Sequence, residues 1–303
     1  MMEKEIEKYI KAGKITANVL EFARTLILSG INDVCELCEE IESKIFKLGG
    51  MPAFPCNICI NEIAAHFSPY PSDRIKLPKE GIVKIDVGVR IDGFITDAAI
   101  SIPLSKNYKK IVKCSKKALE NAIKCVKPGI KTGKLGEIIE KTAKDENFKP
   151  IKNLSGHLIR EYNLHAGKSI PNIRTLFSQK IEEGEIYAIE PFLTFPNAMG
   201  SVTSINKARI FSLAKLKKPR NREGEEIYRE IYRRFRTLPF SPRWLLDLGP
   251  LESVLEKIRV LIKEKIVHAY PVLVEESGGY VAQFEHTVLV TKRGGVILTK
   301  KAS

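Results

Sequence analysis

Three observations predict that this chain folds as an α+β protein. Residues 81–102 have the alternating pattern of a strand hairpin. A pattern of two helices followed by a strand, which begins at Glu-Gly and ends in a carboxylate, occurs twice and suggests two related halves that face each other. Residues 196–267 are basic and largely helical in pattern. We therefore expect a main domain formed by 1–195 and 268–303, with 196–267 as an inserted helical subdomain.

Two helices are predicted at the start of the chain. Residues 3–28 carry apolar side chains at helical spacing, and Ser29-Gly30 ends the segment. A second helix begins near Asn32, a suitable N-cap, and ends at Gly49-Gly50. A strand-like piece then leads through His66 into a proline-rich turn. A single histidine in such a loop is more often structural than catalytic.

The hairpin places two carboxylates on one face of a sheet. Asp92-Gly93 is a dipeptide typical of a tight two-residue turn, so Gly88 should lie opposite Asp97, and Asp86 should be the diagonal neighbour of Asp97. Two converging carboxylates repel each other unless a cation or a shared proton lies between them. The hairpin is therefore either part of a metal site or an exposed sheet face with two solvated aspartates.

The second half repeats the order of the first. A helix is predicted over 109–126, Pro128-Gly129 breaks it, and Thr132 can cap a further helix that runs through Lys144. Two histidine-bearing pieces follow, and then a strand that ends at Glu190.

Two helices are also expected within 196–267, in the stretches EGEEIYREIYRRFRTL and LESVLEKIRVLIKEKIV. A last hairpin turns around residues 293–295 and places Glu285 on the opposite face to Phe284 and His286.

Composition narrows the functional classes. The chain has 303 residues, 44% of them hydrophobic, and a net charge of +14 without one dense basic tract. That charge indicates either a nucleic-acid or ribosome surface or simply a solvated exterior. No apolar run of about 18 residues and no signal-peptide pattern occurs, so we expect a soluble cytoplasmic protein without membrane contact.

Two cysteine pairs have the spacing of a zinc ribbon. Cys35 and Cys38 form one pair, and Cys56 and Cys59 form the other. The first pair lies in a predicted amphipathic helix, and neither pair carries the Gly or Pro of a metal knuckle. Buried free thiols are the favoured interpretation.

The strands together present a hard, oxygen-rich set of candidate ligands. They are Asp86, Asp97, His157, Glu190 and Glu285. Four carboxylates and one imidazole suit two Mn, Fe, Co or Zn ions better than one structural zinc. Two metals about 3.5–4 Å apart can activate a water and polarise a carbonyl, which is the chemistry of peptide-bond hydrolysis.

Four segments, in order, carry a specific resemblance. KIDVG…DGFITDAA, SGHLIREYNLHAGKSIPN, YAIEPF and AQFEHTVLV resemble the methionine aminopeptidases of type 2, which have the pita-bread fold. The similarity covers nearly the whole chain. The long interval between Glu190 and Glu285 is similar to the helical insertion of type 2, and the chain resembles the short archaeal forms, which lack an N-terminal extension.

The resemblance implies a role for each matching residue. Asp86 would chelate one metal, His157 and Glu190 the other, and Asp97 and Glu285 would bridge both. His66 would contact the scissile amide, and His165 would donate a hydrogen bond to the tetrahedral intermediate. Glu190 would also carry a proton to the leaving amine.

An apolar pocket for methionine is also implied. It would draw on Phe54, Leu164, Phe192 and Tyr270, and for each the alternative is ordinary core packing. The segment LTFPNAMGSVTS, residues 193–204, departs from the family pattern and is expected to flank this pocket. His268 and His286 are interpreted as packing residues.

The expected function is removal of the N-terminal initiator methionine from nascent proteins whose second residue is small. Partners would be nascent-chain N-termini and, transiently, the ribosome, and nothing demands more than a monomer. One alternative is an Xaa-Pro peptidase of the same fold. The other is a non-catalytic pita-bread homologue that binds RNA or ribosomes through the basic insertion.

Overall fold

The computed structural model describes residues 2–220 and 222–300 and confirms the α+β class. The helices are α1 (Glu3–Leu28), α2 (Val34–Lys47), η1 (Lys106–Tyr108), α3 (Lys109–Lys124), α4 (Thr132–Asp145), α5 (Arg222–Phe235), η2 (Pro242–Leu248) and α6 (Leu251–Lys263). The strands are β1 (Met51–Ile60), β2 (Ile63–Ala65), β3 (Ile82–Ile91), β4 (Phe94–Pro103), β5 (Lys149–Pro150), β6 (Ser155–Ile159), β7 (Ser169–Pro171), β8 (Ile186–Ile189), β9 (Phe192–Thr194), β10 (Val202–Leu213), β11 (Val267–Glu275), β12 (Ala282–Gln283), β13 (His286–Thr291) and β14 (Gly294–Ile297).

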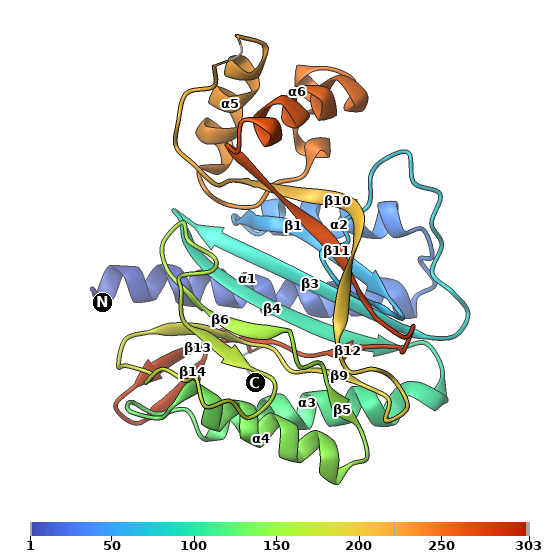
Figure 1. The fold of residues 1–303 in the computed structure, drawn as a ribbon, viewed down its shortest axis with the longest axis vertical. Coiled ribbons are helices and arrows are strands. Elements are labelled where there is room, and N and C mark those ends of the chain that lie inside the picture. The colour runs from blue at the N-terminus through green and yellow to red at the C-terminus, as the bar shows by residue number, and fades with distance from the viewer. Residues whose placement is uncertain (1, 221, 301–303) are drawn as a thin grey trace.

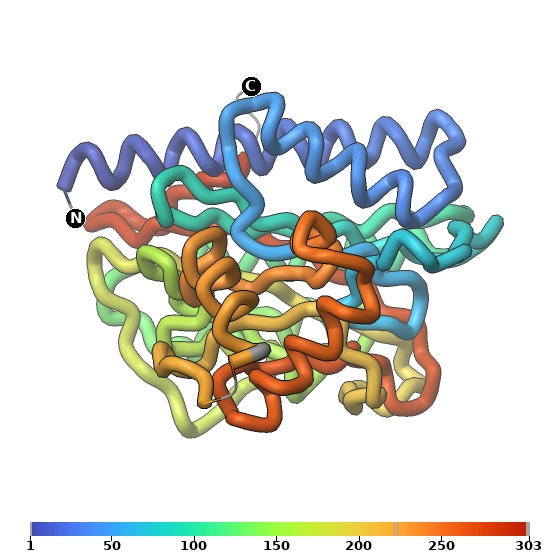
Figure 2. The backbone as a smooth tube through the Cα atoms, turned by 90° about the horizontal axis from the view of Figure 1, so that it is seen from above, coloured from blue at the N-terminus to red at the C-terminus, as the bar shows by residue number. Residues whose placement is uncertain are grey.

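The first half is a sheet in the order β1-β3-β4 covered by α1 and α2. Figure 2 shows the two helices as one layer over the strands. Val83, Ile85, Val87 and Val89 are fully buried in the core that these helices share with the sheet. The alternation of β3 therefore directs Asp86 toward the opposite face, which meets the second half.

The second half repeats this arrangement with α3 and α4 beneath a sheet in the order β14-β13-β8-β6-β7 (Figure 1). Its core contains Leu119 of α3, Leu135 of α4 and Tyr187 of β8. The halves meet where β4 runs beside the start of β13. There Glu285 and Ala99 exchange backbone hydrogen bonds of 2.9 and 3.4 Å.

The predicted hairpin register is confirmed. Ile91 pairs with Phe94, and Gly88 pairs with Asp97. The turn residues Asp92 and Gly93 have φ angles of 48° and 89°, as a tight turn of this kind requires.

The inserted region contains a strand that the sequence did not reveal. Helices α5 and α6 lie where helices were predicted, but residues 202–213 form β10, which pairs with β11. Bulges on either side of Ala208 interrupt its alternation, which is why the sequence lacks a clear strand pattern. Figure 1 shows β10 and β11 running from the insertion to the middle of the molecule. The division at 196 and 267 stays a proposal.

Several helix ends differ from the prediction. Helix α2 ends at Lys47 rather than at Gly49-Gly50, and α6 ends at Lys263 rather than at Val267, which begins β11. Asp33, not Asn32, caps α2, because its Oδ1 accepts hydrogen bonds from the N–H groups of Cys35 and Glu36 at 2.9 and 3.0 Å. Helix α3 ends at Lys124, since Cys125 already lies outside it as the C-cap. Thr132 is the first residue of α4 rather than its cap, and its hydroxyl accepts from the Gln179 N–H instead.

The cysteines are free thiols. Cys38, Cys56 and Cys59 are buried, whereas Cys35 is half-buried. Because Cys35 and Cys38 belong to a regular helix and Cys56 and Cys59 to a strand, the pairs form no metal knuckle. In the described part of the chain, no helix is long and apolar enough to cross a membrane.

Replacing Gly13 of α1 by alanine tests the packing of this helix against the end of the chain. A Cβ at this position would lie 2.1 Å from the Leu298 carbonyl oxygen. Although alanine favours a helix over glycine by about 1 kcal/mol, we expect the clash to prevail and G13A to lower the free energy of unfolding by about 1–3 kcal/mol. Urea denaturation, with the exposed K11A as control, measures the difference. A G13A variant more stable than wild type would contradict the contact.

Candidate metal centre

Five predicted ligands from different elements line one cavity of about 70 Å³ between the halves. They are Asp86 of β3, Asp97 of β4, His157 of β6, Glu190 directly after β8, and Glu285 between β12 and β13. Residues more than 180 apart in sequence thus converge because the two sheets face each other.

The ligand atoms are close enough to share a cation. The Nε2 of His157 lies 3.5 Å from Asp97 Oδ2 and 3.7 Å from Glu190 Oε1. One ligand atom each from Asp97, His157 and Glu285 lies within 4.8 Å of the others. Gln283 Nε2 donates to Glu190 Oε2 at 3.2 Å and to Glu285 Oε2 at 3.4 Å, so this amide holds the two glutamates side by side.

Burial perturbs all four carboxyl groups. Burial raises the pKa of Asp97 to about 7. Burial, followed by the negative charge of Asp97, raises the pKa values of Asp86, Glu190 and Glu285 well above their usual range. Burial also lowers the pKa of His157 to about 4, so that its imidazole is neutral near pH 7. A neutral imidazole is the form that binds a metal.

The side chains fit a bound cation because several of their buried atoms have no hydrogen-bond partner. These atoms are Asp86 Oδ1, Asp97 Oδ1 and Glu285 Oε1. Asp97 is only 4% exposed, and Asp86 is half-buried with its Oδ1 shielded from solvent, so the alternative of two solvated aspartates on an exposed sheet face is wrong. A cation among these oxygens would offset both their desolvation and their repulsion.

Two further histidines border the cavity. His66 has a φ of 65°, a strained angle for a residue other than glycine. Its Nδ1 lies 3.1 Å from the Pro271 carbonyl oxygen, which can only accept, so Nε2 carries no proton when the ring is neutral. Burial lowers the pKa of His66, and it lowers the pKa of His165 to about 3. The rings of His165 and His157 lie 4.3 Å apart.

The apolar part of the cavity contains Phe54, Leu164, Phe192 and Tyr270, which the sequence had suggested. Three more apolar residues, Ala65, Ile210 and Pro239, and the polar Asn57 also line the cavity, and none of them was predicted from the sequence. Residues 193–204 were expected to flank the pocket, yet none of them lines it. His268 packs edge-on against Tyr270, and His286 shares a 2.9 Å hydrogen bond with Thr299, so both lie outside the site.

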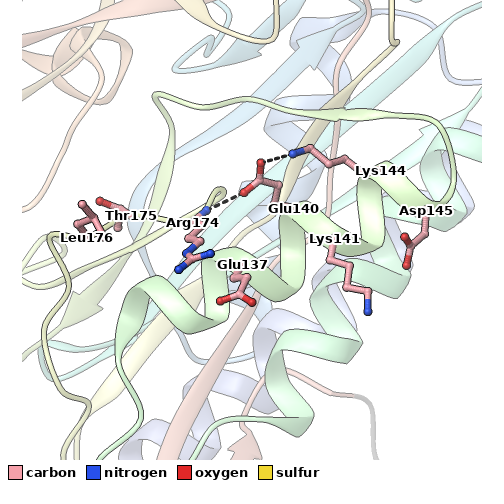
Figure 3. Close-up of a pocket in the computed structure, with 8 residues that line it drawn as sticks. All are labelled: Glu137, Glu140, Lys141, Lys144, Asp145, Arg174, Thr175 and Leu176. Atoms are coloured by element: carbon pink, nitrogen blue, oxygen red, sulfur yellow. Dashed lines mark hydrogen bonds and ion pairs between the residues drawn. The ribbon is translucent and has the colours of Figure 1, made fainter.

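A larger surface hollow lies along α4 (Figure 3). Within it, Glu140 and Lys144 form an ion pair of 2.6 Å. Glu140 also accepts from the Arg174 N–H at 2.9 Å. This hollow is an open charged groove rather than a site with converging ligands.

Comparison with known proteins supports the same chemistry. The model of metallopeptidase family M24 matches residues 7–292. A protein named methionine aminopeptidase from Saccharolobus solfataricus is 42% identical over 303 residues, with 99% of each chain covered.

Solved structures share the fold. A methionine aminopeptidase from Thermotoga maritima has a TM-score of 0.71 at 23% identity, covering 99% of this chain and 98% of its own. A thermophilic Arx1 has a TM-score of 0.85 at 16% identity, covering 100% of this chain and 92% of its own. The pita-bread fold that the resemblance implied is confirmed.

The carboxylate cluster predicts an unusual pH dependence of stability in chelator-treated protein. The pKa of Asp97 is 3.8 in the unfolded reference and about 7 when folded, so the folded state binds more protons between these values. The free energy of unfolding should therefore fall as pH rises through this window. D97N should make the slope shallower, which urea denaturation from pH 4.5 to 7.5 can measure.

Adding Mn²⁺ provides the second half of this test. A ligand that binds only the folded state at 100 times its Kd stabilises by about 2.7 kcal/mol, so wild-type protein should melt at a higher temperature with the ion. D92N, which changes an exposed aspartate in the same hairpin, should respond as wild type does. An equal gain in D97N would count against the site.

Proposed function

We propose that this chain, which belongs to metallopeptidase family M24, is a metal-dependent methionyl aminopeptidase. It hydrolyses the bond after an N-terminal methionine, as the name of its 42% identical relative indicates. The observation that carries this proposal is the joining, in one cavity, of a buried carboxylate–histidine cluster with an apolar wall.

The chain would hold two divalent ions, drawn from Co, Mn, Fe and Zn. Asp86 would hold one ion, His157 and Glu190 the other, and Asp97 and Glu285 would be shared by both. Ions held there would supply an activated water and polarise the peptide carbonyl. Which metal is used depends on cellular supply as much as on the ligands.

The histidines and Glu190 perform the remaining steps. His66 accepts the N–H of the scissile amide at its free Nε2, which orients the bond. His165, kept neutral by burial, donates one N–H to the oxygen that becomes negative in the transition state. Glu190 takes up the proton that the attacking water loses and carries it to the leaving amine.

Phe54, Leu164, Phe192 and Tyr270 enclose the methionine side chain. An unbranched, polarizable thioether suits such a wall. The second residue of the substrate is selected by exclusion, because a cavity without spare room penalises added bulk.

The alternatives have less support. A non-catalytic homologue has no need of a complete ligand set, yet all five ligands line this cavity. An Xaa-Pro peptidase would share these ligands and would differ by cleaving Xaa-Pro dipeptides.

Nascent-chain N-termini are the proposed substrates, and we place the protein in the cytoplasm as a monomer. The net charge of +14 supports a transient contact with the ribosome.

Methionine release from Met-Ala-Ser and Met-Leu-Ser tests the activity directly. Metal-stripped protein should be inactive, and adding Mn, Co, Fe or Zn should restore release from Met-Ala-Ser only. D97A should abolish it, whereas D92N should retain it. Release of Xaa from Xaa-Pro dipeptides instead, or no release with any metal, would contradict the proposal.

Changing His165 tests its role as a donor. Loss of one hydrogen-bond donor to a developing oxyanion lowers kcat by about 10²–10³-fold, and we expect H165A to show this with little change in KM. H268A, which changes a neighbouring histidine outside the cavity, should keep wild-type kcat. If kcat fell equally in H165A and H268A, the effect of H165A would be structural, and the role of His165 as a donor would be contradicted.

A further inference from the structure

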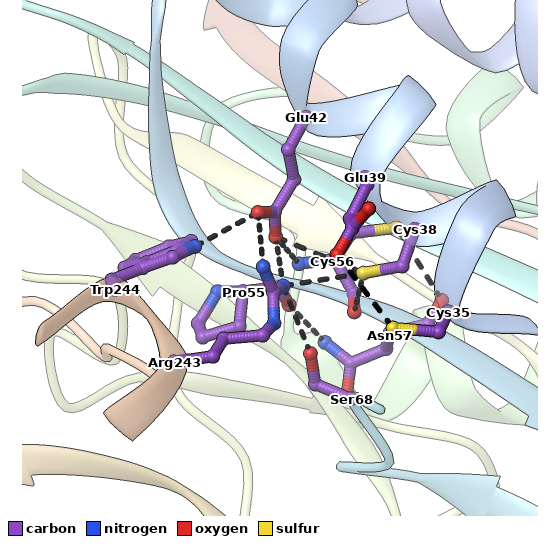
Figure 4. Close-up of polar contacts among 10 residues, drawn as sticks. All are labelled: Cys35, Cys38, Glu39, Glu42, Pro55, Cys56, Asn57, Ser68, Arg243 and Trp244. Carbon is purple, nitrogen blue, oxygen red and sulfur yellow. Dashed lines mark hydrogen bonds and ion pairs between the residues drawn. The ribbon is translucent and has the colours of Figure 1, made fainter. Parts of the chain in front are cut away.

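A buried ion pair joins the insertion to the first half of the molecule. Glu42 of α2 contacts Arg243 of η2, and each side chain is only 7% exposed. Arg243 Nη1 donates to Glu42 Oε2 at 2.6 Å, and Nη2 donates to Oε1. The indole N–H of Trp244 adds a 2.8 Å hydrogen bond to Oε2 (Figure 4). Because the contact is two-pronged, it fixes both distance and orientation.

Glu42 also holds the irregular part of β1. Its Oε1 accepts from the Cys56 N–H at 2.9 Å. The pairing of β1 with β3 shifts register between Phe54 and Asn57, so the Glu42 carboxylate supports the strand where the ladder is interrupted. Phe54 and Asn57, which flank this point, both line the substrate cavity.

Arg243 is linked to two other walls of the cavity, by a contact with Ser68 and by the chain that precedes η2. Its Nη2 donates to Ser68 Oγ at 3.3 Å, two residues beyond His66. The chain just before η2 carries Pro239, a cavity residue, and Phe240. Phe240 exchanges backbone hydrogen bonds of 2.7 and 2.9 Å with Phe211, which follows the cavity residue Ile210.

We propose that the Glu42–Arg243 pair is a positioning device that sets the width of the apolar part of the substrate cavity. It ties together the β1 wall, the His66 segment and the Pro239 wall, which come from distant parts of the sequence. Neither side chain lines the cavity. The pair therefore acts on which N-terminal side chain fits, and not on the reacting atoms; this inference rests on the proposed aminopeptidase function.

The Glu42–Arg243 ion pair is expected to remain intact because both of its side chains are buried. A desolvated carboxylate or guanidinium without its partner is strongly unfavourable, so the two groups do not separate as freely as surface charges do. A purely apolar contact could slide to admit a wider side chain, whereas a two-pronged ion pair resists such a displacement.

Charge-removing variants test the proposal. E42Q keeps the size of the side chain and an acceptor for Cys56, while R243M removes the fork, and R243K serves as a milder change if either variant fails to fold. kcat and KM are measured on Met-Ala-Ser, Leu-Ala-Ser and Phe-Ala-Ser with the metal-loaded full chain. D247N is the matched control, because it removes the negative charge that faces Arg234 inside the insertion, across a 2.8 Å contact, and does not involve β1.

We expect kcat/KM for Leu-Ala-Ser, divided by kcat/KM for Met-Ala-Ser, to rise by about tenfold or more in the variants. One added or missing methylene group in an apolar pocket changes kcat/KM by about this much. The change should appear in KM, with kcat on Met-Ala-Ser and metal content close to wild type. An unchanged ratio in E42Q, R243M and R243K alike, or an equal rise in D247N, would overturn the proposal.

The assay separates this inference from the proposed function. Wild-type protein that releases methionine while the variants keep its selectivity disproves the positioning role alone. If wild-type protein releases no methionine, the proposed aminopeptidase function is contradicted. The positioning role is then tested by calorimetry, through the Kd of free leucine divided by the Kd of free methionine. That ratio should fall in E42Q and stay constant in D247N, and a constant ratio in E42Q would refute the positioning role.

Discussion

The mutual repulsion of four buried carboxyl groups is the constraint on which this structure depends. Each half supplies two of them, so joining the halves brings four acidic groups into one cavity, where they either take up protons or need a cation. The connections along the chain do not by themselves hold these carboxyl groups together. The seam is closed instead by hydrogen bonds beside the charges, as where the Thr287 hydroxyl contacts both the N–H and the carbonyl of Asp97 at 2.7 Å. A fold that is rigid at this seam keeps the carboxylates poised for a cation and prevents them from relaxing apart.

A buried lysine supports the same seam. Lys84 lies on β3 two residues before Asp86, is fully buried, and donates 2.9 Å hydrogen bonds to the carbonyl oxygens of Asn61 and Val281. Burial lowers its pKa to about 8, so it remains largely protonated near pH 7. Because Val281 directly precedes β12, which carries Gln283 toward Glu190 and Glu285, this cation anchors the segment that orders two of the candidate ligands. Lys84 therefore acts on the site through the backbone that it holds.

The sequence predicted the candidate metal ligands more completely than it predicted the other residues that line the cavity. The hairpin alternation and the Asp92-Gly93 turn determine a register, so the relation of Asp86 to Asp97 followed from local rules. Gln283 could have been found the same way, because it precedes Glu285 by two residues and so shares its face. Ile210 could not, since β10 is bulged and Tyr270, with which Ile210 pairs, lies sixty residues away in sequence. Pro239 could not either, because it lies in the connection between α5 and η2, where no strand or helix pattern predicts its position. Likewise, the strained φ of His66 is a tertiary property that no local pattern reveals.

The arrangement separates chemistry from selection. Every candidate ligand comes from the two sheet-forming halves, whereas part of the apolar wall, Ile210 and Pro239, comes from the inserted region. The ligand geometry is therefore set by strand pairing within a rigid frame, and the wall is set by how the insertion is fastened to that frame. A change in the fastening can alter the accepted side chain while the carboxylates keep their places. Since the fastening passes through the buried Glu42 carboxylate rather than through the cavity, selectivity in this fold can vary at positions that never touch the substrate.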